Sequence, residues 1–216
     1  AAGFGEMIAY HLCMNPKHSF QKVAPDHPLF LTLADAAAEN DVAIDIHMEA
    51  IERQAPISPR LGRVCNQNPA TLEPTIPAFE RLLRHNRKAR IVWQHIGWDN
   101  TGQMTPALLA RMLDAHPNLY LALRIPARVA NGSARPVPNR IVDPDYKIWP
   151  HWLELIQSNP DRFVIGSDEC IVPCGGKPRL AASFDPRWAR TWFTGPRLPP
   201  QAPIGRAGSL RRHVHD

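Results

Sequence analysis

The chain alternates between short, continuous apolar runs and longer stretches in which apolar residues recur at helical spacing. Apolar runs bounded by polar residues predict strands, and the recurring spacing predicts amphipathic helices. Five runs predict strands, at residues 1–6, 42–47, 90–95, 118–123 and 162–167. Between them, helices are predicted at about residues 28–40, 76–88, 105–116 and 150–159.

Residues at the start of these helices have the chemistry of helix caps. Asp26 is the expected cap of the first helix, with Pro28 in its first turn. Thr75 and Thr105 are the expected caps of the second and third helices, and Pro150 opens the fourth. These signals locate the helix starts more closely than the periodicity alone.

Strands that are apolar throughout and alternate with helices indicate parallel βαβ units, so the predicted fold class is α/β. Two architectures are built from such units, the doubly wound open sheet and the (β/α)8 barrel. A nucleotide-binding doubly wound sheet needs a glycine-rich turn after a strand. The GFGE segment at 3–6 is too short for that motif, and no phosphate-binding loop is present. The barrel is therefore favoured.

Ionisable residues follow the ends of the five predicted strands: Glu6, His47, His95, Arg124 and Asp168. The carboxyl ends of parallel strands emerge on one face of the fold, where active sites are built. Two imidazoles and a carboxylate with an open position are a common shell for a catalytic divalent metal, including zinc. The pattern therefore predicts a metal site at the mouth formed by these strand ends.

Each of these residues also has an ordinary structural interpretation. A single histidine at a strand end is most often a polar group at the sheet surface, Asp168 suits the cap of a turn, and Arg124 suits an ion pair. The ordered set is harder to explain in this way. Two further histidines, His85 and His116, are expected to be solvated surface residues because they lie in helical or loop contexts.

The motifs IDIHMEA, QHIGWDN and FVIGSDE resemble the strand-end motifs of the amidohydrolase superfamily, specifically the amidohydrolase-related (amidohydrolase 2) group of metal-dependent TIM-barrel hydrolases. The resemblance implies that His47 ends strand 5, His95 ends strand 6 and Asp168 ends strand 8, all three as metal ligands. Glu6, at the end of strand 4, is a further candidate ligand. The implied fold is a partial (β/α)8 TIM barrel, strands 4–8 with a parallel sheet and outer helices, over residues 1–170.

Two features depart from the family pattern. The His-x-His of strand 1 is absent before residue 47, as are strands 1–3, and the chain begins without methionine, which favours a fragment. Residues 171–216 form a Pro/Arg-rich tail with seven prolines and seven arginines and little helical periodicity. This second segment is expected to be irregular and to pack poorly beyond about residue 185. We hypothesise a frameshift near residues 171–190, which the coding DNA tests.

The resemblance implies a metal-dependent hydrolase that acts on a small amide, ester or lactone through metal-activated water. A divalent metal is the expected cofactor, with Zn²⁺ favoured, and Asp168 is the expected catalytic proton acceptor. Arg124 suits a substrate carboxylate, and Asp45 and Glu49 are the nearest candidates to fix the histidine tautomers. The alternatives are a family-type decarboxylase or hydratase, or a catalytically silent half-barrel that serves as an interaction module.

Charge and cysteine usage narrow the range of partners. Residues 171–216 carry eight basic and two acidic residues, whereas residues 1–170 carry 17 and 18, so the main body is nearly neutral. No nucleic-acid partner is therefore expected, and no apolar run is long enough to predict a membrane span. A cytoplasmic location is favoured, although a missing start could have held a targeting signal. The four cysteines are expected to be reduced thiols, with a metal role for Cys170 and Cys174 as the alternative.

Overall fold

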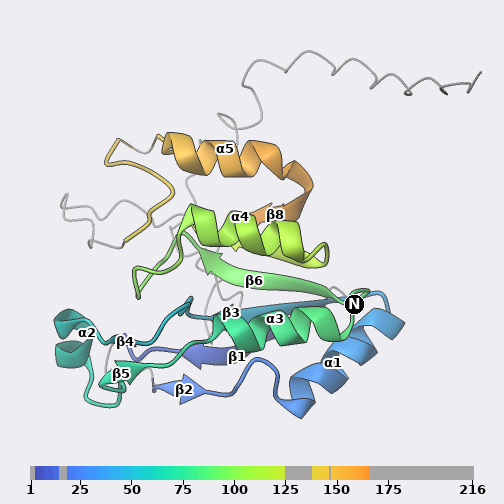
Figure 1. Cartoon of the computed structure of the whole chain (residues 1–216), viewed down its shortest axis with the longest axis horizontal. Coiled ribbons are helices and arrows are strands. Elements are labelled where there is room, and N and C mark those ends of the chain that lie inside the picture. The colour runs from blue at the N-terminus through green and yellow to red at the C-terminus, as the bar shows by residue number, and fades with distance from the viewer. Residues whose placement is uncertain (1–2, 15–18, 125–137, 146, 166–216) are drawn as a thin grey trace, which may run out of the picture. The chain divides into compact units, whose positions relative to one another are not determined.

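The computed structural model describes residues 3–14, 19–124, 138–145 and 147–165. The chain divides into two units, Ala1–Ser183 and Phe184–Asp216, and the second lies wholly outside the described residues. In the first unit the described residues form an α/β structure around a mostly parallel six-stranded sheet, with a separate two-stranded sheet (Figure 1). The predicted α/β class is confirmed.

The strands and helices follow the predicted alternation. The strands are β1 (Gly3–His11), β2 (Gln21–Lys22), β3 (Ala43–Met48), β4 (Ala55–Pro56), β5 (Thr71–Leu72), β6 (Arg90–Ile96), β7 (Leu119–Leu123) and β8 (Phe163–Ile165). The helices are α1 (Pro28–Glu39), α2 (Pro59–Val64), α3 (Ile76–His85), α4 (Pro106–Ala115) and α5 (Pro150–Ser158), with a 3-10 turn at Pro160–Arg162. Among the described residues, no helix is long and apolar enough to cross a bilayer.

The main sheet has the strand order β2-β1-β3-β6-β7-β8. Strand β2 runs antiparallel to β1, and the five other strands run parallel to one another. The predicted neighbours β3, β6, β7 and β8 are therefore confirmed, in chain order. Helix α1 packs on α3, and α4 packs on α5 (Figure 1).

The two faces of the sheet differ in polarity. Ile44 and Ile46 of β3 are fully buried and pair in register with Ile91 and Trp93 of β6. The Trp93 ring lies 5.2 Å from Phe79 of α3, so this face packs on helices. Side chains alternate between the two faces of a strand, which places the polar residues of β3 on the opposite face.

Two local expectations were wrong, and four short elements were missed. Strand β1 runs on to His11, so Glu6 lies inside the strand instead of ending it. Helix α1 is capped by the His27 ring, which accepts a hydrogen bond from the Leu29 amide, while Asp26 pairs with Arg81. Short elements β2, β4, α2 and β5 were not predicted, because two to six residues give too little periodicity to detect. The Thr105 cap is confirmed, since its side chain accepts from the Leu108 amide.

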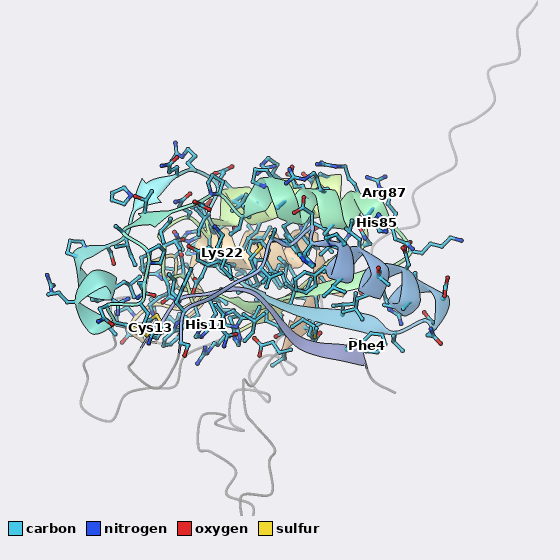
Figure 2. All side chains as sticks on the ribbon, turned by 90° about the horizontal axis from the view of Figure 1, so that it is seen from below. Phe4, His11, Cys13, Lys22, His85 and Arg87 are labelled. Carbon is cyan, nitrogen blue, oxygen red and sulfur yellow. A yellow bond between two sulfur atoms is a disulfide. The ribbon has the colours of Figure 1, made fainter. Side chains whose placement is uncertain are left out.

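Cys13 and Cys65 form a disulfide, which corrects the expectation of reduced thiols for this pair. Their Cα atoms lie 5.9 Å apart, within the range that a disulfide requires. The Asn68 side chain bonds both the amide and the carbonyl of Cys13, which holds the segment beyond β1 against the loop after α2. Figure 2 shows Cys13 beside His11, at the opposite end of β1 from Phe4. Cys170 and Cys174 lie outside the described residues.

Reduction of the Cys13–Cys65 disulfide should lower the free energy of unfolding. The bond joins residues 52 positions apart, and closing a loop of that length stabilises a fold by about 4 kcal/mol in the chain-entropy account. Urea denaturation with and without reductant, and of a Cys13→Ser/Cys65→Ser variant, measures the loss. A Cys170→Ser/Cys174→Ser variant is the control and should keep the sensitivity to reductant. Equal midpoints for oxidised and reduced wild type would contradict the prediction.

His116 is buried, with only 1% of its surface exposed, which corrects the expectation of a solvated residue. It lies at the C-terminal cap of α4, and among the described residues neither ring nitrogen has a hydrogen-bond partner. Burial lowers the pKa of His116, and the nearby charge of Glu80 opposes this shift only in part. His85 is partly exposed and pairs with Asp35.

Stability should therefore fall in acid through His116. Its pKa is lower in the folded state than in the unfolded state, where it is about 6.5, so protonation favours unfolding. The stabilising difference is complete above about pH 6.5 and is lost as the pH falls below that value. In a His116→Gln variant, the urea midpoint should drop less between pH 8 and pH 5.5 than in wild type. An equal drop in both proteins would rule out the His116 contribution, and His85→Gln is the control.

Candidate metal centre

Three side chains from three neighbouring strands meet on the polar face of the sheet. One carboxylate oxygen of Glu6 lies 2.6 Å from Nδ1 of His47 and 2.7 Å from Nε2 of His95. The two imidazole centroids are 4.6 Å apart, and the candidate ligand atoms all lie within 4.8 Å of one another. The structure therefore brings Glu6, His47 and His95 together, whereas Asp168 lies outside the described residues.

Glu6 reaches this cluster through an irregularity in β1. The register between β1 and β3 shifts between Phe4 and Met7, and farther along Ile8 pairs with His47. Since Glu6 precedes Ile8 by two residues, both side chains lie on the face of His47. Gly5 is required here, because a Cβ atom at this position would overlap Asp45.

His95 reaches the same face because the backbone turns. In the register of β3 and β6, Asp45 pairs with Val92 and Ile46 with Trp93, so regular alternation would send His95 to the helix-facing side. Instead His95 has a φ of 63°, and the register between β6 and β7 shifts after Trp93. Few non-glycine residues adopt this left-handed conformation, so the surrounding structure must hold it.

The loop that follows His95 supplies that support. The Trp98 amide bonds the His95 carbonyl at 2.9 Å. Asp99, 1% exposed, accepts hydrogen bonds from the amides of Thr101, Gly102 and Met104, so it organises the loop from inside. Such a set of bonds to one buried carboxylate fixes a loop whose amides have no sheet partner.

The charge state of Glu6 suits a metal ligand. Burial alone would raise the pKa of Glu6, but the hydrogen bonds and charges of His47 and His95 outweigh it and hold the pKa well below its usual range. Glu6 is therefore an anion under ordinary conditions. One carboxylate and two imidazoles are donors that zinc and related divalent ions accept. Because the three donors already lie close together, the residues present fit a divalent metal.

His11 belongs to the same mouth and was missed in the sequence. It is the last residue of β1, and its ring centroid lies 4.8 Å from that of His47. The missed signal was the length of β1: the run continues past Glu6 through the apolar residues Met7, Ile8 and Ala9.

Arg124 follows β7, and its guanidinium lies over the ring of Trp98, 4.4 Å from the centroid. Its amide bonds the Ile96 carbonyl, so the backbone there is fixed by the end of β6. The attraction between a guanidinium and the face of an indole ring keeps the planar guanidinium oriented. The structure thus places Arg124 beside the loop that follows His95.

Asp45 and Glu49 were the nearest candidates in sequence to fix the histidine tautomers, but the structure pairs each of them with another residue. One carboxylate oxygen of Glu6 contacts one ring nitrogen of each histidine. Asp45 bonds Gln94, and burial raises its pKa. Glu49 turns into the protein, where burial, opposed in part by a hydrogen bond from Asn100, raises its pKa to about 8.

Comparison with known proteins identifies the family. The family profile of the amidohydrolases matches residues 17–203, well over half of the chain. The chain belongs to the amidohydrolase superfamily. This match confirms the resemblance and reaches beyond residue 170, where the resemblance was expected to end. Membership supports a hydrolase-type function. Searches of the curated proteins and of the solved structures gave no match.

Gly97 should be less replaceable than Gly102, the other glycine of the loop after β6. Its φ is 93°, and a Cβ atom there would overlap Ile141, whereas Gly102, with a φ of 80°, has open space around its Cβ position. Alanine at a positive φ costs about 1–2 kcal/mol, so Gly102→Ala should lose about that much. Gly97→Ala should lose about 1–3 kcal/mol more through overpacking. Urea unfolding of both variants measures the difference, and equal losses would contradict the prediction.

Proposed function

We propose that the chain forms strands 4–8 of a (β/α)8 barrel and is a metal-dependent hydrolase of a small amide, ester or lactone. The observation that carries this proposal is the convergence of Glu6, His47 and His95 on one point. Family membership supports a hydrolase-type reaction, and the parallel order of β1, β3, β6, β7 and β8 is compatible with such a barrel.

Glu6, His47 and His95 would hold the metal, and Asp168, a ligand by resemblance, would complete the shell. A bound divalent ion supplies water of lowered pKa and polarises a carbonyl. In this proposal, Asp168 accepts the proton of the attacking water and returns it to the leaving group. The negative charge of Glu6 keeps the mouth attractive to a cation before substrate arrives.

Arg124 would bind a carboxylate of the substrate. Its guanidinium is held over Trp98, in the loop that follows His95, which supports a place near the reacting bond. Two parallel N–H donors match a carboxylate better than a single point charge does. Small amides, esters or lactones that also carry a carboxylate are therefore the preferred substrates in this proposal.

Metal binding tests the proposal directly. Wild type should bind Zn²⁺, and Glu6→Ala, His47→Ala and His95→Ala should each weaken binding by at least the roughly 10–100-fold that loss of a supporting group costs. His85→Ala is the matched control, because that ring pairs with Asp35 outside the cluster. Calorimetric titration of each metal-free protein measures the affinity of the wild type and of all four variants.

Turnover is then assayed on a panel of amides, esters and lactones with and without a carboxylate. Zinc-dependent hydrolysis that favours the carboxylates would support the hydrolase. A protein that binds zinc and turns over none of them would refute the hydrolase and leave the decarboxylase or hydratase and the silent half-barrel as alternatives, and one that binds no zinc would refute the metal site.

A further inference from the structure

Glu49 makes hydrogen bonds to several chain segments, which a role in metal binding would not explain. It is 4% exposed and lies directly after β3, two residues beyond His47. Its amide donates to the Tyr10 carbonyl at 3.1 Å, and its carbonyl accepts from the Thr75 hydroxyl at 2.8 Å. Its backbone therefore ties the end of β1 to the start of α3.

The side chain of Glu49 makes two more connections. Its Oε1 atom accepts a hydrogen bond from Nδ2 of Asn100 at 2.8 Å, and its carboxyl group also accepts from the Leu12 amide. Leu12 lies in the segment after β1, and Asn100 lies in the loop after β6. One buried side chain thus joins the segments that follow two strands of the metal centre.

The bond to Asn100 bears on His95. Asn100 is 8% exposed and lies five residues beyond His95, in the loop that holds the left-handed turn. A second tether runs beside it, from the Thr101 hydroxyl to the Ala50 carbonyl at 2.6 Å. Both tethers fasten this loop to the residues just after β3, which carries His47.

We propose that Glu49 is a positioning residue, which through Asn100 holds the loop after β6 in the turn that brings His95 to Glu6 and His47. Without this anchor the backbone at His95 relaxes toward a common strand conformation, and the ring turns to the helix-facing side that regular alternation assigns to it. The consequence for metal affinity rests on the proposed function, whereas the placement of the His95 ring does not.

The first test reads the position of His95 in the metal-free protein. Imidazole nitrogen signals are recorded by NMR, and the His95 signal is assigned from its loss in His95→Gln. In Glu49→Ala and in Asn100→Ala that signal should move to the shift of an imidazole that is not bound to a carboxylate. In the double variant the His95 signal should move no farther than in either single variant, because the two substitutions remove the same hydrogen bond.

Asn118→Ala is the matched control. Asn118 is also a buried polar residue, 4% exposed, and its amide bonds three carbonyls, of Leu83, Asn86 and Ala89. It precedes β7 and so lies at the other end of the sheet from the strand-end mouth. This variant should lose stability and leave the His95 signal in place. If Glu49→Ala does not fold, Asn100→Ala, which keeps the carboxyl group, decides the test alone.

The second test titrates the same variants with Co²⁺, whose visible spectrum reports on ligand geometry. Glu49→Ala and Asn100→Ala should bind the ion about 10–100-fold more weakly than wild type, and Asn118→Ala should bind as wild type does. A wild type that binds no Co²⁺ would refute the metal centre, while the imidazole signals would still decide the role of Glu49. Unmoved His95 signals in both anchor variants, or an equal movement in Asn118→Ala, would overturn the positioning role.

Discussion

The mouth of this fold depends on one carboxylate oxygen held between two imidazoles. Glu6 lies within hydrogen-bond distance of His47 and His95, and the three residues come from β1, β3 and β6, which are neighbours in the sheet. A carboxylate that is partly removed from water, as that of Glu6 is, keeps its charge when donors surround it. The two rings are those donors, so the charge of Glu6 and the aim of the histidines are set together. Any metal chemistry in the proposed hydrolase begins from this arrangement.

The sheet could be predicted because its strands leave a simple mark in the sequence. Strands β6 and β7 are nearly continuous apolar runs, β3 alternates apolar and ionisable residues, and the helices between these strands carry proline at their first or second position. His47 and His95 could be proposed as partners because both end such runs. The side on which His95 lies could not be predicted, since alternation along β6 assigns it to the wrong face. The left-handed backbone conformation of His95 turns its ring to the other face. The only trace of this turn in the sequence is Gly97, two residues later.

Three of the expectations that failed concern contacts between residues far apart in the chain. The disulfide joins Cys13 to Cys65 across a loop whose path has no periodicity, and His116 is buried by packing that its position at a helix end does not reveal. Glu49 looked like a partner of the adjacent histidine, yet its side chain bonds Asn100, 51 residues away. In each case local pattern gives the residue type, while the partner is decided by how the loops after the strands return over the sheet.

Those loops are placed by buried polar side chains because they have no ladder of backbone hydrogen bonds to place them. Thr75, Glu49 and Asp99 each satisfy amides or carbonyls that would otherwise be buried without partners. Such a bond adds little net stability, but removing one partner leaves the other unsatisfied at a cost of about 1–3 kcal/mol. Alternative loop positions are therefore disfavoured by every bond at once. In the same way, these bonds keep the donors of a site assembled from three strands close together. This holds although one donor, His95, lies in a left-handed turn that regular strand geometry does not favour.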